Sequence, residues 1–292
     1  MQPVKAIEIK LKVKIMIDFK VDIDKCTSCG FCAEDCPAQI IKMNPTPSIQ
    51  KSREKLCIKC QHCLAICPTA AISILGIKPE NSLSTSIELP TYECITNLIK
   101  TRRSVRKYVD EDLDQNLIQE LLETTVYAPT GHNYNSVHFT LIDKKEDLKL
   151  FRDMVYAAIK KAGESKTLLP KFQILYAIQK VWETNGVDVI FRNAPHLLIA
   201  SAPSQTSSPL PDCLIALSYF ELLANSHNIG TLWNGMLTWV LNDIDPSISK
   251  LIGIPETHSI GYGMIFGKSA VKYPRTIQSD SLNLNRVNMS KA

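Results

Sequence analysis

The sequence predicts two folded parts: a short cysteine-rich segment and an α/β or α+β domain of about 200 residues. Three observations predict this division. Eight of the ten cysteines lie between Cys26 and Cys67. The stretch 77–93 combines two prolines and three serines with little periodicity, which is typical of a linker. From about residue 94, helical patterns alternate with apolar strands.

The composition excludes several classes of protein. The 292 residues are 45% hydrophobic and 21% charged, which is typical of a globular chain. No apolar run reaches the roughly 20 residues of a membrane helix, so we expect no membrane contact. The first residues lack the continuous apolar core of a signal peptide, and we therefore expect a cytoplasmic protein. The net charge of +4 forms no basic patch that would indicate nucleic acid as a partner.

Periodicity places the expected elements within these parts. Alternation of apolar and mostly charged residues over 7–23 predicts a strand, with a loosely held extension as the open alternative for 1–16. An apolar stripe over 113–122 predicts a helix, and 212–228 predicts a buried one. Strands are expected over 137–142, 197–202 and 259–266. The expected division is an extension 1–16, a cysteine-rich domain 17–76, a linker 77–93 and a second domain 94–292.

The cysteines form a repeated motif. The runs Cys26–Pro37 and Cys57–Pro68 both follow C-x2-C-x2-C-x3-C-P, and the second begins 31 residues after the first. Three thiolates spaced by two residues can wrap one face of a cubane iron–sulfur cluster, while the fourth points toward the other cluster. Clustered cysteines in a chain without export signals indicate metal binding rather than disulfides.

This motif resembles that of bacterial two-cluster ferredoxins, over roughly residues 17–76. The resemblance implies two 4Fe–4S clusters, each held by three cysteines of one run and the last cysteine of the other. The implied ligand sets are Cys26, Cys29, Cys32 and Cys67, and Cys57, Cys60, Cys63 and Cys36. The alternative is a pair of zinc sites, but zinc requires neither the third cysteine nor the Cys-Pro. The remaining two cysteines, Cys94 and Cys213, are interpreted as small buried hydrophobic residues rather than nucleophiles.

Four further fragments lie in the second domain. They are Arg102-Arg103-Ser104-Val105-Arg106, the loop from Ala128 to Ser136, Leu232-Trp233-Asn234-Gly235, and Lys272-Tyr273-Pro274-Arg275. Arginines offer forked donors to phosphate oxygens, so the first fragment is a candidate phosphate site, although a solvated basic turn is the alternative. Asp212, near the start of the expected helix, is favourable there without a further role.

In this order the fragments resemble the FMN-dependent nitroreductase family, over roughly residues 94–292. The resemblance implies an α+β fold and a homodimer with FMN at the interface, so that the whole chain looks like a ferredoxin–nitroreductase fusion. It implies that Arg102, Arg103, Ser104 and Arg106 hold the phosphate and ribityl end, with Lys272 and Arg275. It also implies that Pro129, Thr130 and Gly131 approach the flavin from the partner subunit, and that Asn133 and Asn135 lie near the ring and the interface. Leu232, Trp233, Asn234 and Gly235 would lie near the ring.

The resulting hypothesis is a flavin-dependent oxidoreductase that reduces nitroaromatic compounds or quinones. The clusters relay single electrons, and no catalytic side chain is assigned because the cofactor carries the chemistry. The electron donor is either NAD(P)H at the flavin or a reduced ferredoxin or reductase at the clusters. Two alternatives stay open: an electron-transfer or redox-sensing module, and a reductive dehalogenase or ene reductase on the same fold.

Overall fold

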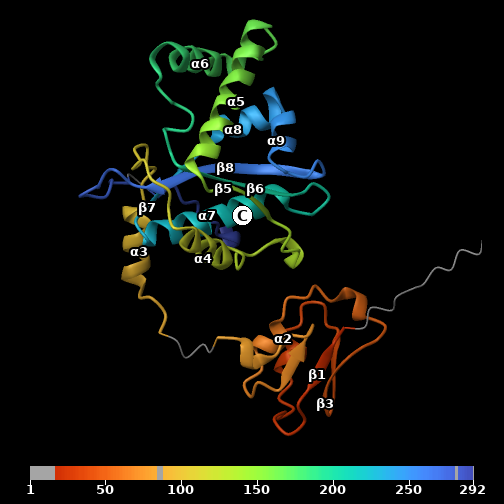
Figure 1. Cartoon of the computed structure of the whole chain (residues 1–292). Helices are drawn as coiled ribbons and strands as arrows, with labels where there is room; N and C mark the ends of the chain where they lie inside the picture. The colour runs from red at the N-terminus through yellow and green to blue at the C-terminus, as the bar shows by residue number, and fades with distance from the viewer. Residues whose placement is uncertain (1–16, 84–87, 280–281, 292) are drawn as a thin grey trace, which may run out of the picture. The chain divides into compact units, whose positions relative to one another are not determined.

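The computed structural model shown in Figure 1 describes residues 17–83, 88–279 and 282–291. The chain divides between Leu89 and Pro90 into two compact units. The expected extension 1–16 lies outside the described residues, and so does most of the expected strand 7–23. Within the described part, that strand is represented by β1 (Phe19–Val21).

The first unit contains two small antiparallel strand pairs and two short helices. β1 pairs with β4 (Ile72–Ile74), and β2 (Ile41–Asn44) pairs with β3 (Thr46–Ile49). The helices are α1 (Phe31–Glu34) and α2 (His62–Ala65), and the 3-10 turns are η1 (Glu54–Leu56) and η2 (Pro79–Asn81). Its buried core mixes cysteines with aliphatic side chains: Cys32, Ile40, Ile41, Cys63, Leu64, Ile72 and Ile74.

The sequence repeat of the first unit is also a repeat of backbone conformation. Three left-handed positions in the first half recur 31 residues later in the second half. The pairs are Ser28 and Lys59 (φ 55° and 57°), Gly30 and Gln61 (84° and 61°), and Gln39 and Ala70 (50° and 52°). Gly30 and Gln61 are also the residues that precede α1 and α2. Because most side chains disfavour this conformation, its recurrence indicates that both halves build the same loop.

The second unit is built on a four-stranded antiparallel sheet. The strand order is β5 (His138–Ile142), β6 (His196–Pro203), β8 (His258–Lys268) and β7 (Ile229–Trp233). β6 is buried from His196 to Ala202, since it is an inner strand with helices on both faces of the sheet. Its register with β8 shifts between Ala200 and Ser201.

Helices form a layer on each face of this sheet (Figure 1). α4 (Gln115–Thr125) and α7 (Pro209–Ser226) cover one face, and α3 (Tyr92–Thr101) packs against α7. α5 (Lys145–Glu164), α6 (Gln173–Asn185) and α8 (Gly235–Trp239) contribute to the core on the other face. The remaining helical segments are α9 (Ser247–Leu251), the π-helical η5 (Val240–Ile244), and the 3-10 turns η3 (Gly131–Asn133), η4 (Pro170–Phe172) and η6 (Met289–Lys291). The arrangement confirms the α+β class.

One expected element differs in its burial. The helix expected to be buried over 212–228 is α7, and its inner face does pack on the sheet. Its outer face, however, exposes large apolar side chains, namely Leu210, Leu214, Ile215 and Tyr219. The sequence pattern predicted burial because α7 is apolar all round, which is typical of a helix covered on every side.

Within the described residues, no helix combines the length and the apolarity that crossing a membrane requires.

Candidate cofactor sites

The eight clustered cysteines line two separate cavities in the first unit. One cavity, of about 300 Å³, is lined by Cys26, Cys29, Cys32 and Cys67. The other, of about 380 Å³, is lined by Cys36, Cys57, Cys60 and Cys63. The division of cysteines between the cavities matches the two ligand sets that the sequence implied. Each cavity thus draws three thiols from one run and the fourth from the other.

The backbone around the cavities suits an anionic inorganic group. In each repeat, two left-handed residues flank a cysteine: Ser28 and Gly30 around Cys29, and Lys59 and Gln61 around Cys60. Alternating right- and left-handed residues turn successive N–H groups into one concavity, a conformation found at phosphate and iron–sulfur sites. The donor set and the backbone therefore both fit a cluster in each cavity.

Burial affects the thiols unequally. Burial raises the pKa of Cys63 to about 12, so a cluster bound there must stabilise the thiolate against desolvation. Burial also raises the pKa of Cys67, but hydrogen bonds from the backbone of Ala71 and from Thr69 reverse the shift, and the net pKa falls below the usual value. The Ala71 N–H lies 3.2 Å from the Cys67 sulfur.

The spacing of these thiols does not suit a single ion. Over residues 17–83, 88–279 and 282–291, no three His, Cys, Asp or Glu side chains lie close enough together to hold one metal ion. A zinc site brings four ligand atoms to about 2.0–2.3 Å from one centre. Four cysteines that line a cavity without converging on a point are better suited to a cluster of several metal and sulfide ions.

The two other cysteines have no part in these cavities. Cys94 is exposed on α3, and Cys213 is fully buried in α7. Burial raises the pKa of Cys213 to about 12, so its thiol stays protonated at neutral pH. This confirms the interpretation of Cys213 as a small buried hydrophobic residue, whereas the same interpretation of Cys94 is wrong, because Cys94 is exposed.

The arginine segment continues the sheet of the second unit at its β7 edge. Ser104 forms a parallel bridge to Thr231, and the Val105 N–H donates to the Thr231 carbonyl at 2.9 Å. Farther along, Tyr108 bridges to Ser269, just beyond β8. The segment is therefore fixed to β7 and β8 by its backbone.

A large cavity gathers cationic side chains from three parts of the sequence. It measures about 1270 Å³, and its lining includes Arg103, Lys268 and Lys272 together with Asn225 and Asn228. The Lys268 ammonium lies 2.6 Å from Glu111, so its charge is already balanced. Arg103 and Lys272 thus line one cavity, although they lie far apart in the sequence. Arg275 lies on the exposed segment beyond Lys272.

Two other arginines of the segment are placed differently. Arg102 Nη1 lies 2.9 Å from Oε1 of Glu221, a residue of α7 that is only 7% exposed. The Thr231 hydroxyl donates to the same oxygen at 3.3 Å. Arg106 Nη1 donates to the Ser104 carbonyl at 3.2 Å and is otherwise exposed. Glu221 was not anticipated from the sequence, and it balances the charge of Arg102.

Close packing at Gly230 holds the arginine segment against β7. A Cβ added at Gly230 would lie 2.6–2.8 Å from the side-chain carbons of Val105. We expect Gly230→Ala to lower the free energy of unfolding by roughly 1–3 kcal/mol, because it overpacks this contact. Chemical denaturation checks this. Val105→Ala in the same chain should recover part of the loss, and strictly additive effects of the two changes would contradict the packing argument.

The loop after α4 is anchored to the start of α7. The Gly131 N–H donates to Asp212 Oδ1 at 3.0 Å, and Asp212 is only 2% exposed. The Thr130 hydroxyl accepts from the Asn135 N–H at 2.9 Å, which closes the loop on itself. Asp212, interpreted from the sequence as a favourable helix residue, thus also fixes the position of Gly131.

Within one chain, this loop and the cationic cavity lie at opposite ends of α7. Asp212 holds the loop near the first turn, whereas Asn225 in the last turn lines the cavity. At 1.5 Å per residue, the helix separates the two by about 20 Å. The structure therefore does not bring Pro129, Thr130, Gly131, Asn133 and Asn135 together with Arg103 and Lys272 in one subunit.

The segment after β7 is shaped by a buried amide. Asn234 is 3% exposed, its Oδ1 accepts from the Leu237 N–H at 3.1 Å, and its Nδ2 donates to the Ile190 carbonyl at 3.0 Å. The side chain of Asn234 therefore caps α8 and holds the chain. Gly235 begins α8, and a Cβ there would lie 2.5 Å from the Tyr262 hydroxyl. Trp233 packs edge-on against Tyr262 at 5.3 Å, and Leu232 contributes to the core.

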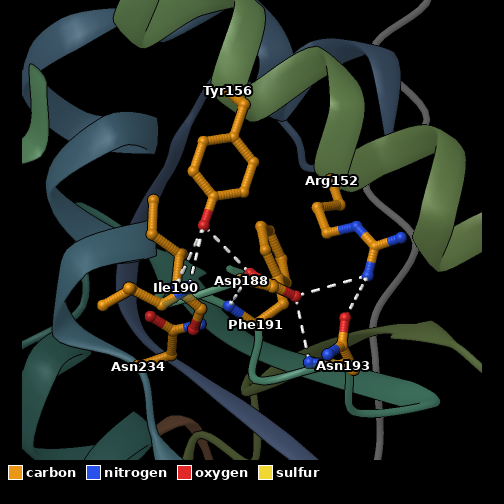
Figure 2. Close-up of polar contacts among 8 residues, drawn as sticks. Arg152, Tyr156, Asp188, Ile190, Phe191, Asn193 and Asn234 are labelled. Atoms are coloured by element: carbon orange, nitrogen blue, oxygen red, sulfur yellow. Dashed lines mark hydrogen bonds and ion pairs between the residues drawn. The ribbon is translucent and has the colours of Figure 1, made fainter. Parts of the chain in front are cut away.

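A buried polar network supports this segment from behind (Figure 2). The Asp188 carboxylate accepts from the Tyr156 hydroxyl at 3.0 Å, from the N–H groups of Phe191 and Asn193 at 2.9 and 3.0 Å, and from Arg152 at 3.3 Å. These bonds fix the turn whose Ile190 carbonyl receives Asn234. Burial, followed by the charge of Asp188, raises the pKa of Tyr156 above its usual value, so the phenol remains a donor.

Comparisons with known proteins agree with this geometry. The family model described as the nitroreductase family matches residues 99–268, and the model of a 4Fe–4S dicluster domain matches residues 25–72. A protein of Methanothermobacter thermautotrophicus is 25% identical over 175 residues, which are 59% of this chain and 74% of that protein. Its provisional name is NADH dehydrogenase/NAD(P)H nitroreductase.

Two solved structures share the fold. A nitroreductase of Bacteroides fragilis with bound FMN has a TM-score of 0.53 and 23% identity, over 66% of this chain and 98% of that one. A nitroreductase of Desulfitobacterium hafniense with bound FMN has a TM-score of 0.52 and 21% identity, over 66% of this chain and 97% of that one. At these identities the likeness concerns the fold.

The fold, the cysteine cavities and the matched models define a flavin-type oxidoreductase joined to an iron–sulfur domain. The chain belongs to the nitroreductase family, and a 4Fe–4S dicluster domain precedes its nitroreductase domain. This confirms the fusion that the sequence resemblance predicted.

Proposed function

We propose that the protein is an FMN- and iron–sulfur-dependent reductase of nitroaromatic compounds or quinones, in which two 4Fe–4S clusters relay electrons to or from the flavin. The observation that carries the proposal is the joint presence, in one chain, of two four-cysteine cavities and a cationic cavity on a nitroreductase fold. Each of these features suits one cofactor of such an enzyme.

The cysteine cavities would hold the clusters. Cys26, Cys29, Cys32 and Cys67 ligate one, and Cys36, Cys57, Cys60 and Cys63 ligate the other. When bound, the clusters supply one-electron chemistry. The hydrogen bond from the Ala71 N–H to the Cys67 sulfur stabilises negative charge on that ligand, an interaction that tunes such sites.

The cationic cavity would hold the phosphate of FMN. Arg103 and Lys272 line it and form no ion pair within the described part of the chain, whereas Lys268 is paired with Glu111. Ser104, Arg106 and Arg275 lie on the adjoining segments and complete the phosphate and ribityl contacts. Arg102 is held by Glu221, and the guanidinium donors that this pair leaves over would add to these contacts.

The segment Leu232–Gly235 would border the flavin ring. Asn234 fixes the backbone from its buried position, so that Gly235 can present its N–H and its bare Cα surface. When bound, FMN supplies both hydride and single-electron chemistry, and we assign no catalytic side chain to the protein. NAD(P)H at the ring and a carrier protein at the clusters are the two candidate donors.

A second copy of the chain would complete the site. The loop Pro129–Asn135 lies about 20 Å along α7 from the cationic cavity of its own subunit, so it can contact a flavin only across a dimer interface. The exposed apolar face of α7 is suited to bury itself against its symmetry mate. We propose a homodimer with Pro129, Thr130, Gly131, Asn133 and Asn135 reaching the partner's cofactor.

Removal of two cations tests the phosphate site. We expect Arg103→Ala combined with Lys272→Ala to weaken FMN binding by two orders of magnitude or more, since each charged hydrogen bond contributes about 1.5–3 kcal/mol. Fluorescence titration of the apoprotein with FMN measures this. The matched control is Lys268→Ala, which lines the same cavity but is paired with Glu111. If the double variant and the control weaken FMN binding equally, the assignment of this cavity as the phosphate site is contradicted.

Turnover separates the proposed enzyme from a redox relay. With NADH, NADPH or a reduced ferredoxin as donor, an enzyme reduces a nitroaromatic compound or a quinone through many anaerobic cycles. A relay or sensor gives one stoichiometric oxidation and then stops. Multiple turnover with neither acceptor, but with a halogenated aromatic compound or an activated alkene, would instead indicate a dehalogenase or an ene reductase.

A further inference from the structure

We propose that the exposed basic segment 51–59 is the docking surface for an acidic one-electron carrier protein, which delivers electrons to the cavity of Cys36, Cys57, Cys60 and Cys63. The inference deepens the proposed function, because it requires a cluster in that cavity. It adds the class of the partner, the face on which the partner docks, and the cluster that receives the electron.

The basic segment carries uncompensated positive charge. Lys51, Arg53, Lys55 and Lys59 are all exposed, and in the described part of the first unit none of them forms an ion pair. The one acidic residue among them, Glu54, accepts a hydrogen bond from the backbone N–H of Ile17. Arg53 donates to the Ala38 carbonyl at 3.0 Å, which ties the segment to the loop after Cys36.

Elsewhere in the described part of the first unit, two lysines are paired with carboxylates, whereas Lys42 and Lys78 form no ion pair. Lys20 pairs with Asp18 at 3.1 Å, and Lys25 pairs with Asp22 at 3.3 Å and with Glu80 at 3.6 Å. The run that carries Cys26 to Cys36 also contains two acidic residues of its own, Glu34 and Asp35. Most of the described cations of the unit that form no ion pair therefore lie in the basic segment, which also carries Cys57 of the second cavity.

The same segment offers an apolar centre close to that cavity. Leu56 ends the η1 turn and is 53% exposed, and the next residue, Cys57, lines the cavity. An exposed leucine on a segment that carries four exposed cations suits a small, transient interface, in which charge steers the encounter and a few apolar contacts hold it. A carrier with a negative surface is complementary to this arrangement.

The step at this surface is a single electron transfer. The reduced centre of the carrier loses one electron, and the cluster held by Cys36, Cys57, Cys60 and Cys63 gains it. No bond forms or breaks and no proton is required. The carrier itself is the reductant, so the charges of the two proteins change by equal and opposite amounts.

Charge reversal on the segment tests the proposal. The holoprotein is mixed anaerobically in a stopped-flow instrument with a reduced acidic two-cluster ferredoxin, and bleaching of the protein's clusters is followed separately from the flavin. At low salt, we expect Lys51→Glu combined with Lys55→Glu to lower the second-order rate constant of cluster reduction about tenfold or more. High salt should narrow the difference between this variant and the original protein, because it screens the charges. Neither lysine is a cluster ligand or lines either cavity.

Two controls define the outcome. Lys20→Glu with Lys78→Glu makes the same change of charge on exposed residues of the same unit, and it should leave the rate within about twofold of the original. Reduction by dithionite should be equal in all three proteins. Equal ferredoxin rates in the test and control variants would overturn the proposal.

Other results are also decisive. If the charge-reversed protein accepts electrons from ferredoxin at the normal rate but transfers them more slowly from cluster to flavin, the segment acts toward the nitroreductase domain of the chain. This result would also overturn the proposal. Salt-dependent bleaching of the clusters in a protein that fails to bind flavin would support the docking surface while rejecting the proposed function.

Discussion

Replacing Cys60 by alanine is expected to remove about half of the bound iron and sulfide, because the cavity of Cys36, Cys57, Cys60 and Cys63 loses one of four ligands. Cys29→Ala should do the same for the other cavity, since Cys29 occupies the equivalent position of the repeat. The double variant should lose nearly all iron. Flavin content should stay near normal in each, because the flavin site is built from the second unit.

The chain offers a matched control for this experiment. Cys94 is exposed on α3 and lines neither cysteine cavity, so Cys94→Ala should leave iron, sulfide and flavin unchanged. Metal analysis and absorption spectra of anaerobically purified proteins measure all three. Loss of iron in equal amounts from Cys94→Ala and Cys60→Ala would contradict the assignment of ligands, and complete loss from either ligand variant would show that the two clusters do not assemble independently.

Replacing Asp188 by alanine is expected to lower the free energy of unfolding of the nitroreductase domain by about 3–5 kcal/mol. The Asp188 side chain is fully buried and accepts four hydrogen bonds (Figure 2). Its loss leaves the Arg152 guanidinium, whose side chain is 14% exposed, without its buried partner. It also leaves the N–H groups of Phe191 and Asn193 without an acceptor, which adds to the cost.

Asp188→Asn should be nearly as harmful, although it preserves the shape of the side chain. An amide has only one acceptor oxygen, so its NH₂ group would face an N–H donor. Denaturant unfolding followed by tryptophan fluorescence suits the measurement, because Trp182 stacks on Tyr156 at 5.0 Å within the network. The control is Asp153→Ala, at an exposed position of α5, the helix that carries Arg152 and Tyr156. It should change the free energy of unfolding by less than about 0.5 kcal/mol. Similar losses in the Asp188 and Asp153 variants would contradict the role of the network.

The two four-cysteine cavities could be predicted from the sequence because their information is local. Ligands spaced by two residues, followed by Cys-Pro, determine the loop and the helix start, and the structure repeats this conformation 31 residues later. The elements with strong periodicity, such as α4 and β6, were predicted for the same reason. β7 was not predicted as a strand, because its five residues include Gly230 and lack a clear alternation.

The supporting contacts of the flavin domain could not be predicted, because they join residues far apart in sequence. Arg102 and Glu221 are 119 positions apart, and Arg152 and Asp188 are 36 apart. Each of these four residues is charged, and a charged residue in a sequence is ordinarily expected at the surface. Only the packing of α7 against β7, and of α5 against the turn after α6, reveals that they are buried and paired.

Asn234 shows the same limit at a predicted site residue. The family resemblance implied that Asn234 lies near the flavin ring, but in the structure its side chain caps α8 and binds the Ile190 carbonyl. Its role toward a flavin ring is therefore proposed to be that of a positioning residue. The sequence could indicate that the segment matters, while the direction of the amide depended on a turn 44 residues away.

The most direct test of the account is the cofactor content of the full-length protein purified without oxygen. Quantitative iron, acid-labile sulfide, zinc and FMN should give about eight iron, about eight sulfide and about one FMN per chain, with no stoichiometric zinc. A protein that contains zinc in place of iron and sulfide, or that binds no flavin when FMN is supplied, would contradict the account.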